Sequence, residues 1–196
     1  MRLTLAATTG FLLSALAVAM GITRSADRAI LDALQPLASP PVDFVSSLLS
    51  AVGGVVVTSG AALLLTAVLL RRRDPWALVP LLLFVGVGIE IVLKRVIDHP
   101  APPAELLRDA HWLAVGGSDG GGNAFPSGHV SRTTFLALLV AGRWPWARWA
   151  AAILVAAMAF TRVYSASHWL SDVVGGLCLG AALAGLAAWV ATRSRT

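Results

Sequence analysis

The chain has 196 residues, and 57% of them are hydrophobic while 13% are charged, about half the charged share of soluble domains. This composition excludes an ordinary soluble domain, and it excludes a disordered chain, which needs low hydrophobicity and high charge. The net charge of +5 comes from basic residues spread between apolar runs. Because they form no single basic patch, the sequence argues against a nucleic-acid partner.

Six apolar segments follow one another along the chain, each close to the roughly 20 residues that cross a bilayer core. The fourth is short and contains Arg132, so it can span only if its first turn lies in protein or water. The sequence therefore predicts an all-α integral membrane protein with six transmembrane helices in a single domain, residues 1–196. The predicted helices cover residues 3–22, 44–70, 76–93, 129–141, 147–163 and 169–191.

Two polar stretches separate these segments. Residues 23–43 place Asp27 and Asp32 among apolar residues such as Leu31, which is typical of an amphipathic helix lying at the membrane interface. Residues 98–126 are rich in Pro and Gly, which predicts a loop on the outer side.

The distribution of Arg and Lys predicts the orientation. With the N-terminus in the cytoplasm, the inner side carries eight basic residues and one acidic residue, and the outer side carries seven basic and nine acidic residues. Both termini are then cytoplasmic. Alternatively, Arg2 and the sequence Ala17-Val18-Ala19 resemble a signal peptide with its cleavage site; cleavage would leave the orientation of the later helices unchanged.

Polar side chains gather at the outer ends of the segments, including three of the four His residues and the single Lys. Ionisable groups are costly in an apolar chain, and such a cluster therefore predicts a functional site. Its members are Glu90, Lys94, Arg95, His99, Ser127, His129, Arg132, Arg162, His168 and Asp172.

His168 and Asp172 are four residues apart, so on a helix they share one face and can touch. A carboxylate beneath an imidazole fixes its tautomer and stabilises the charged ring, as a nucleophilic or basic His requires. The alternative is an interfacial pair that only caps or orients the helix.

The hexapeptide 124–129 opens the fourth segment. Gly128 permits close backbone approach, and amides at a helix N-terminus favour an anion. Ser127 can donate a hydroxyl hydrogen, and His129 can donate a proton to a leaving oxygen. The alternative is an ordinary Pro-Ser helix start with an incidental His.

Glu90 and Lys94 lie four residues apart on the third segment. They form either a structural ion pair or an arrangement in which Glu90 directs Lys94 towards an anion. The outer histidines and Asp172 could bind zinc, but Lys94, Arg132 and Arg162 would repel a cation and suit a phosphate. We therefore predict no metal and no cofactor.

Together these segments resemble the type 2 phosphatidic acid phosphatase family, membrane lipid phosphatases related to the soluble vanadium haloperoxidases. That family carries three motifs in order: K-x6-R-P, P-S-G-H and S-R-x5-H-x3-D. The second and third are matched by 126–129 and 161–172, with Thr161 in place of Ser. The first is matched by Lys94 and Pro102, but Ala101 stands where the motif has Arg.

The resemblance implies a reaction without metal that passes through a phosphohistidine. His168 would attack phosphorus while Asp172 holds its ring, and His129 would protonate the departing oxygen and then activate water. The implied phosphate ligands are Lys94, Ser127, Gly128 and Arg162. Arg95, His99 and Arg132 could replace the missing Arg. Arg132, one turn beyond the second motif, is the preferred candidate.

The implied function is a phosphatase of membrane lipid phosphates, with its site facing the periplasm or exterior of a bacterial cell. Candidate substrates are a polyprenyl diphosphate, phosphatidic acid, phosphatidylglycerol phosphate and a polyprenyl-linked sugar phosphate. Because Ala101 removes an expected ligand, two alternatives stay open: a non-hydrolytic lipid-phosphate binder or flippase-like protein, and a phosphotransferase using the same histidine.

Overall fold

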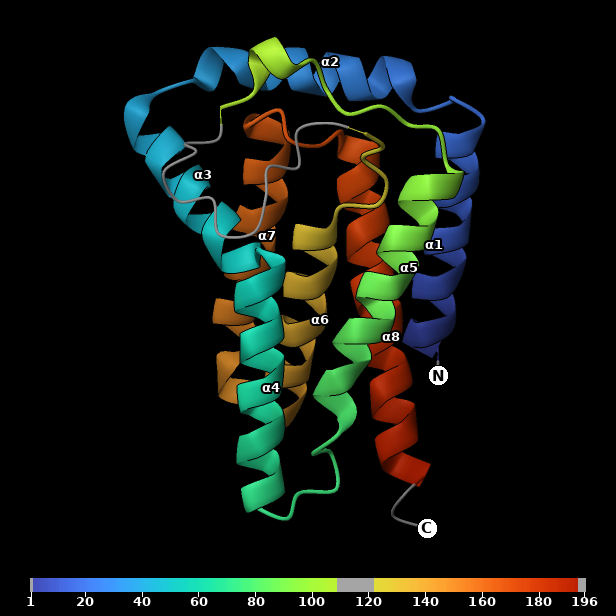
Figure 1. Ribbon diagram of the computed structural model, residues 1–196, viewed down its shortest axis with the longest axis vertical. Coiled ribbons are helices and arrows are strands. Elements are labelled where there is room, and N and C mark those ends of the chain that lie inside the picture. The colour runs from blue at the N-terminus through green and yellow to red at the C-terminus, as the bar shows by residue number, and fades with distance from the viewer. Residues whose placement is uncertain (1, 109–121, 194–196) are drawn as a thin grey trace.

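The computed structural model describes residues 2–108 and 122–193, and within these ranges the regular elements are helices. Most of the long helices run along the molecule, while α2 crosses one end of the bundle (Figure 1). The helices are α1 (Arg2–Ala19), α2 (Arg24–Leu34), α3 (Pro40–Gly53), α4 (Val55–Arg71), α5 (Leu82–Val96), α6 (Gly128–Arg143), α7 (Arg148–Tyr164) and α8 (Leu170–Arg193).

α6 is the central helix, because it contacts α3, α4, α5, α7 and α8. Its contact with α8 is close because glycines on α8 face its backbone. A Cβ atom on Gly176 would lie 2.6 Å from the Ser127 carbonyl oxygen, and one on Gly180 would collide with the Ser131 carbonyl oxygen. The two glycines are four residues apart, so they form one face that lets the two backbones approach.

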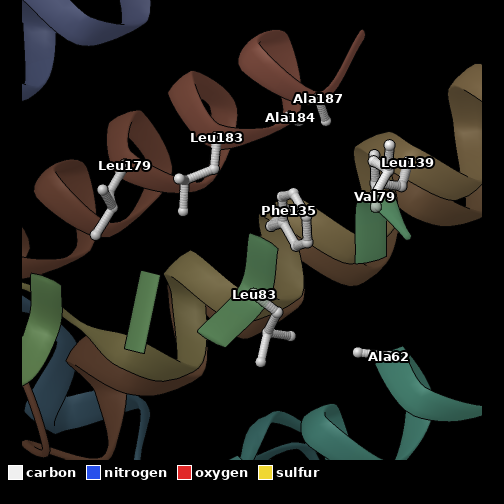
Figure 2. Close-up of a cluster of buried hydrophobic side chains, with 9 residues drawn as sticks. All are labelled: Ala62, Val79, Leu83, Phe135, Leu139, Leu179, Leu183, Ala184 and Ala187. Atoms are coloured by element: carbon white, nitrogen blue, oxygen red, sulfur yellow. The ribbon is translucent and has the colours of Figure 1, made fainter. Parts of the chain in front are cut away.

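A cluster of buried apolar side chains fills the bundle between α4, α5, α6 and α8, with Phe135 of α6 at its middle (Figure 2). In a membrane-spanning bundle, van der Waals packing of such side chains holds the helices together. The cluster comprises Ala62, Val79, Leu83, Phe135, Leu139, Leu179, Leu183, Ala184 and Ala187. It supports the half of the bundle away from α2, and smaller apolar clusters, such as Val18, Ile97 and Phe125, lie nearer the α2 end.

The second predicted segment, 44–70, is not one straight helix. α3 already begins at Pro40, and the chain bends by 51° where Gly53 and Gly54 separate it from α4. Paired small residues are common at such breaks. The bend leans α3 against α6 and α7 (Figure 1). The Ser46 carbonyl, the Ser50 hydroxyl and the Gly53 carbonyl of α3 thereby contact arginines of α6 and α7.

The segment expected at the membrane interface, 23–43, contains α2, which turns by 94° from α1. Its buried side is formed by Asp27 and Leu31. α2 therefore covers the end of the bundle at which α6 and α8 begin (Figure 1). The loop predicted at 98–126 contains a short 3-10 turn, Ala104–Leu106, and its residues 109–121 lie outside the described part.

Length and composition mark two helices as able to cross a membrane alone, Pro145–Tyr164 and Leu170–Val190. Up to four candidates result when each of two bent pairs, α1 with α2 and α3 with α4, counts as one span. The start of α1 and the end of α8 lie at the same end of the bundle, opposite α2 (Figure 1). Six spans and their orientation stay predictions.

Candidate active site

The three motif segments meet at the end of the bundle that α2 covers (Figure 1). α5 ends there, α6 and α8 begin there, and α7 ends with Arg162 in its last turn. Backbone hydrogen bonds join the segments: the Ser127 amide donates to the Asp172 carbonyl at 3.0 Å, and the His168 amide donates to the Arg162 carbonyl at 3.1 Å. The second and third motifs therefore form one unit.

His168 and Asp172 are the buried centre of this unit, with exposed fractions of 1% and 0%. His168 Nδ1 lies 3.4 Å from Asp172 Oδ2, which also accepts a hydrogen bond of 2.9 Å from the Trp169 amide. The other oxygen, Oδ1, lies 3.3 Å from His99 Nε2. The carboxylate therefore lies between two imidazoles, one on each oxygen.

Ser127 precedes α6 as its N-cap residue, but its side chain does not cap the helix. The hydroxyl is buried and has no hydrogen-bond partner among the residues described. Gly128 opens the helix, and a Cβ atom there would collide with the Glu90 carboxylate. A negative charge therefore already lies against the first turn of α6, where helix amides favour an anion.

Glu90 binds two cations. Lys94 Nζ lies 3.2 Å from Oε1 and Arg132 Nη1 lies 2.6 Å from Oε2. Arg132, 7% exposed, also donates from Nη2 to the Gly53 carbonyl at 3.3 Å. The structure thus brings Arg132 beside Lys94, while it leaves Arg95 exposed at the end of α5.

The third cation, Arg162, is 0% exposed and is held by α3. It donates from Nη1 to Ser50 Oγ at 3.0 Å and from Nη2 to the Ser46 carbonyl at 3.4 Å. The end of α3 also contacts the second motif, because a Cβ atom on Gly53 would lie 3.0 Å from His129 Cδ2. These α3 contacts are missing from the sequence prediction, although Ser46 and Ser50, four apart in an apolar helix, are a detectable signal.

Asn123 is a second residue of the site that the sequence does not predict. Its Nδ2 donates to the Lys94 carbonyl at 3.0 Å, and its Oδ1 accepts from the His99 amide at 2.9 Å. The neighbouring Ala124 amide donates to the His99 carbonyl at 2.8 Å. Asn123 therefore ties the first motif to the second, and nothing in its sequence context indicates this.

Asp27 of α2 is a third residue of the site that the sequence does not predict. It is 2% exposed, and its carboxylate accepts two hydrogen bonds of 2.8 Å, from the amide and the hydroxyl of Ser171. The sequence predicts it in an amphipathic helix at the membrane interface, where it is spaced among apolar residues. Its burial follows from the docking of α2 over the start of α8.

The donor set at this end of the bundle is one for an anion. Lys94, Arg132 and Arg162 approach from three different helices, and the α6 N-terminus adds backbone amides. Within residues 2–108 and 122–193 no group of three or more His, Cys, Asp or Glu side chains is arranged to hold a metal ion. Guanidinium, ammonium and amide donors are the groups that bind phosphate oxygens.

Comparison with known proteins gives a family and a relative. A family model described as the PAP2 superfamily matches residues 75–195. The decaprenylphosphoryl-5-phosphoribose phosphatase of Mycobacterium tuberculosis, from strains CDC 1551 / Oshkosh and ATCC 25618 / H37Rv, is 34% identical over 116 residues. The match covers 57% of this chain and 58% of that protein, less than two thirds of its length.

Two solved structures share the fold. A transmembrane PAP2 type phosphatidylglycerolphosphate phosphatase from Bacillus subtilis superimposes with a TM-score of 0.78 over 98% of both chains, at 22% identity. LpxE from Aquifex aeolicus superimposes with a TM-score of 0.64 over 82% of this chain and 93% of its own, at 19% identity. The family match includes more than half of the chain and all three motif segments, and the chain therefore belongs to the PAP2 superfamily.

Proposed function

We propose that this protein is a metal-independent membrane phosphatase that hydrolyses a lipid phosphate through a phosphohistidine. The observation that carries the proposal is the buried His168–Asp172 pair, joined by backbone hydrogen bonds to the P-S-G-H segment and to Arg162. A nucleophile, an acid–base group and cations from three helices therefore share one end of the bundle.

The reaction has two steps. With its proton on Nδ1, towards Asp172, His168 carries the attacking lone pair on Nε2, and attack forms the P–N bond while the P–O bond to the lipid alcohol breaks. His129 gives a proton to the departing oxygen. It then takes one from water, whose oxygen attacks the phosphohistidine, breaks the P–N bond and releases phosphate.

The phosphate oxygens are bound by Lys94, Arg162, the Ser127 hydroxyl and the Gly128 amide. Charge in phosphoryl transfer spreads over these oxygens, so preorganised donors stabilise the transition state. The Ser127 hydroxyl supports this assignment because it is buried without a partner in the described structure. Arg132 Nε, also buried without a partner there, supports Arg132 as a replacement for the arginine that Ala101 lacks.

The substrate is an amphiphile whose tail stays in the bilayer while its phosphate enters the polar end of the bundle. The Mycobacterium relative is named for a decaprenyl-linked phosphoribose, which favours a polyprenyl-linked sugar phosphate. The Bacillus structure is named for phosphatidylglycerol phosphate, which keeps a glycerophospholipid as the second candidate.

The test is phosphate release by the detergent-purified protein from a panel of lipid phosphates, with and without EDTA. We expect release that EDTA does not affect, and its loss in His168→Ala; circular dichroism should show that this variant is still folded and helical. A brief incubation with a ³²P-labelled substrate at high pH should leave acid-labile label on His168.

Four other results would contradict the proposal. Activity in His168→Ala would show that His168 is not the nucleophile, and inhibition by EDTA would show that the reaction needs a metal ion. Binding without release would indicate a lipid-phosphate binder or flippase-like protein, whereas transfer of label to an added alcohol in place of water would indicate a phosphotransferase.

A further inference from the structure

His99 approaches the catalytic pair from the side opposite His168. It lies after α5, in the segment that should bear the first motif's arginine, and it is 5% exposed. Its Nε2 lies 3.3 Å from Asp172 Oδ1, while His168 Nδ1 lies 3.4 Å from Asp172 Oδ2. The two rings therefore do not compete for one oxygen; each faces its own.

His99 is itself held at both ends. Its amide donates to the Asn123 side-chain oxygen at 2.9 Å, and its carbonyl accepts from the Ala124 amide at 2.8 Å. Its Nε2 also lies 3.4 Å from Ser171 Oγ, whose hydroxyl donates to Asp27 at 2.8 Å. A continuous series of buried polar groups thus runs from α2 to the pair.

The charges around His99 explain why the ring points this way. Two buried carboxylates, Asp27 and Asp172, face it from α2 and α8, and His168 lies beyond Asp172. Arg24 lines the same cavity of about 490 Å³ as His99 and Asp27. A buried carboxylate is costly unless it accepts hydrogen bonds, and with its proton on Nε2, His99 would offer Asp172 Oδ1 a donor at 3.3 Å.

We propose that His99 is a positioning residue, secured by Ser171 and Asp27, that holds Asp172 Oδ1 so that Oδ2 stays directed at His168. It acts through Asp172 and does not bind the phosphate. The proposal rests on the proposed role of His168 as nucleophile. Fixing Oδ2 keeps the His168 proton on Nδ1, and this leaves Nε2 as the attacking atom.

A kinetic cycle tests the path of action. We expect His99→Leu to lower kcat by about 10- to 100-fold, the usual cost of losing a group that orients a catalytic ligand, with KM nearly unchanged. His99→Gln, whose amide can donate at the Nε2 position, should recover most of the rate. Since His99 acts through Asp172, His99→Leu should add nothing to Asp172→Ala. Multiplied losses, or a raised KM alone, would instead make His99 a phosphate ligand and overturn the proposal.

A second readout does not need turnover. ¹⁵N NMR of labelled histidine rings should show His168 protonated at Nδ1 in the wild type and a mixture of tautomers in His99→Leu. Asp27→Asn should shift the mixture in the same direction, whereas the matched control Asp32→Asn, on the exposed face of the same helix, should not. An unchanged His168 tautomer in His99→Leu and Asp27→Asn would overturn the inference even in an active enzyme. A changed tautomer in a protein that releases no phosphate would uphold the inference about geometry and reject the phosphatase.

Discussion

Glu90 is the carboxylate on which two cations of the site converge. It binds Lys94 on its own helix and Arg132 on α6, and both partners are largely withdrawn from water. The sequence left open whether Glu90 and Lys94 form a structural pair or direct Lys94 towards an anion. The structure adds Arg132 to the pair and places all three groups at the first turn of α6, where a phosphate would bind.

Glu90→Gln should destabilise the protein. The change leaves buried Arg132 without its counter-charge, and removing one partner of a buried pair typically costs about 3–5 kcal/mol. Thermal unfolding in detergent should show a clear loss, and Arg132→Met in the same chain should recover most of it. Asp32→Asn, which breaks the exposed pair with Arg28, should change stability by less than about 1 kcal/mol. Equal losses in the two single variants would mean that Glu90 is not a buried counter-charge.

Ala101→Arg restores the residue that the first motif lacks. Ala101 lines the cavity that also contains Arg24 and His99, so the longer side chain has space. A charge-assisted hydrogen bond to phosphate contributes about 1.5–3 kcal/mol, and we expect a lower KM for the lipid phosphate with unchanged stability. Steady-state kinetics would check this; a KM equal to that of the wild type would show that the position does not face the substrate.

At the scale of the helices, the close approach of α6 and α8 is what joins the second motif to the third. Gly176 faces the carbonyl of Ser127, the residue whose amide donates to the Asp172 carbonyl. A side chain at Gly176 would have to push the two helices apart at that point. The glycine face of α8 therefore supports the catalytic geometry as well as the packing.

Gly176→Ala should lower both stability and turnover. Its Cβ atom would lie 2.6 Å from a backbone oxygen that cannot rotate away, and overpacking of this kind typically costs about 1–3 kcal/mol. Gly60→Ala is the matched control, because a Cβ atom there meets nothing within 4 Å and alanine favours a helix. Thermal unfolding and phosphate release should distinguish the two variants. Wild-type stability and activity in Gly176→Ala would mean that α6 and α8 can move apart without a loss of free energy.

The features of the site that the sequence predicts are those that depend on the spacing of nearby residues. The contact of His168 with Asp172 depends on one helical turn, and the start of a helix at Gly128 depends on the Pro-Ser sequence before it. The contacts of Asn123, Asp27 and α3 depend on how distant segments dock, which no local pattern contains. The bend after α3 falls at a Gly-Gly pair, which is a local signal for a break. The uninterrupted apolar run 44–70 nevertheless favours one continuous helix.

The two ends of the whole molecule differ in the residues they carry. α2, the motif segments and the loop after α5 gather at one end, and the start of α1, the end of α4 and the end of α8 lie at the other (Figure 1). The excess of Arg over acidic residues at the second end predicts that it faces the cytoplasm. The site then opens to the periplasm or exterior.

Cysteine labelling would check this orientation in a Cys178→Ser background. Ala104, exposed after α5, and Trp146, 82% exposed before α7, lie at opposite ends of the bundle. A maleimide that cannot cross membranes should label Ala104→Cys in intact cells, and it should label Trp146→Cys only after permeabilisation. The reverse pattern would invert the topology and place the site in the cytoplasm.

The Glu90 carboxylate against Gly128 also bears on which phosphates can compete for the site. It is a resident anion, attached to the protein at a high effective concentration, and in the proposed reaction an incoming phosphate would have to displace it from Lys94 and Arg132. A soluble phosphate ion would compete with Glu90 only at its low concentration in bulk water. A phosphate on a lipid tail is confined to the membrane plane and is concentrated beside the site. If the proposed function holds, tethering on both sides of the exchange would favour the lipid over the free ion, and it would ease the departure of inorganic phosphate after hydrolysis.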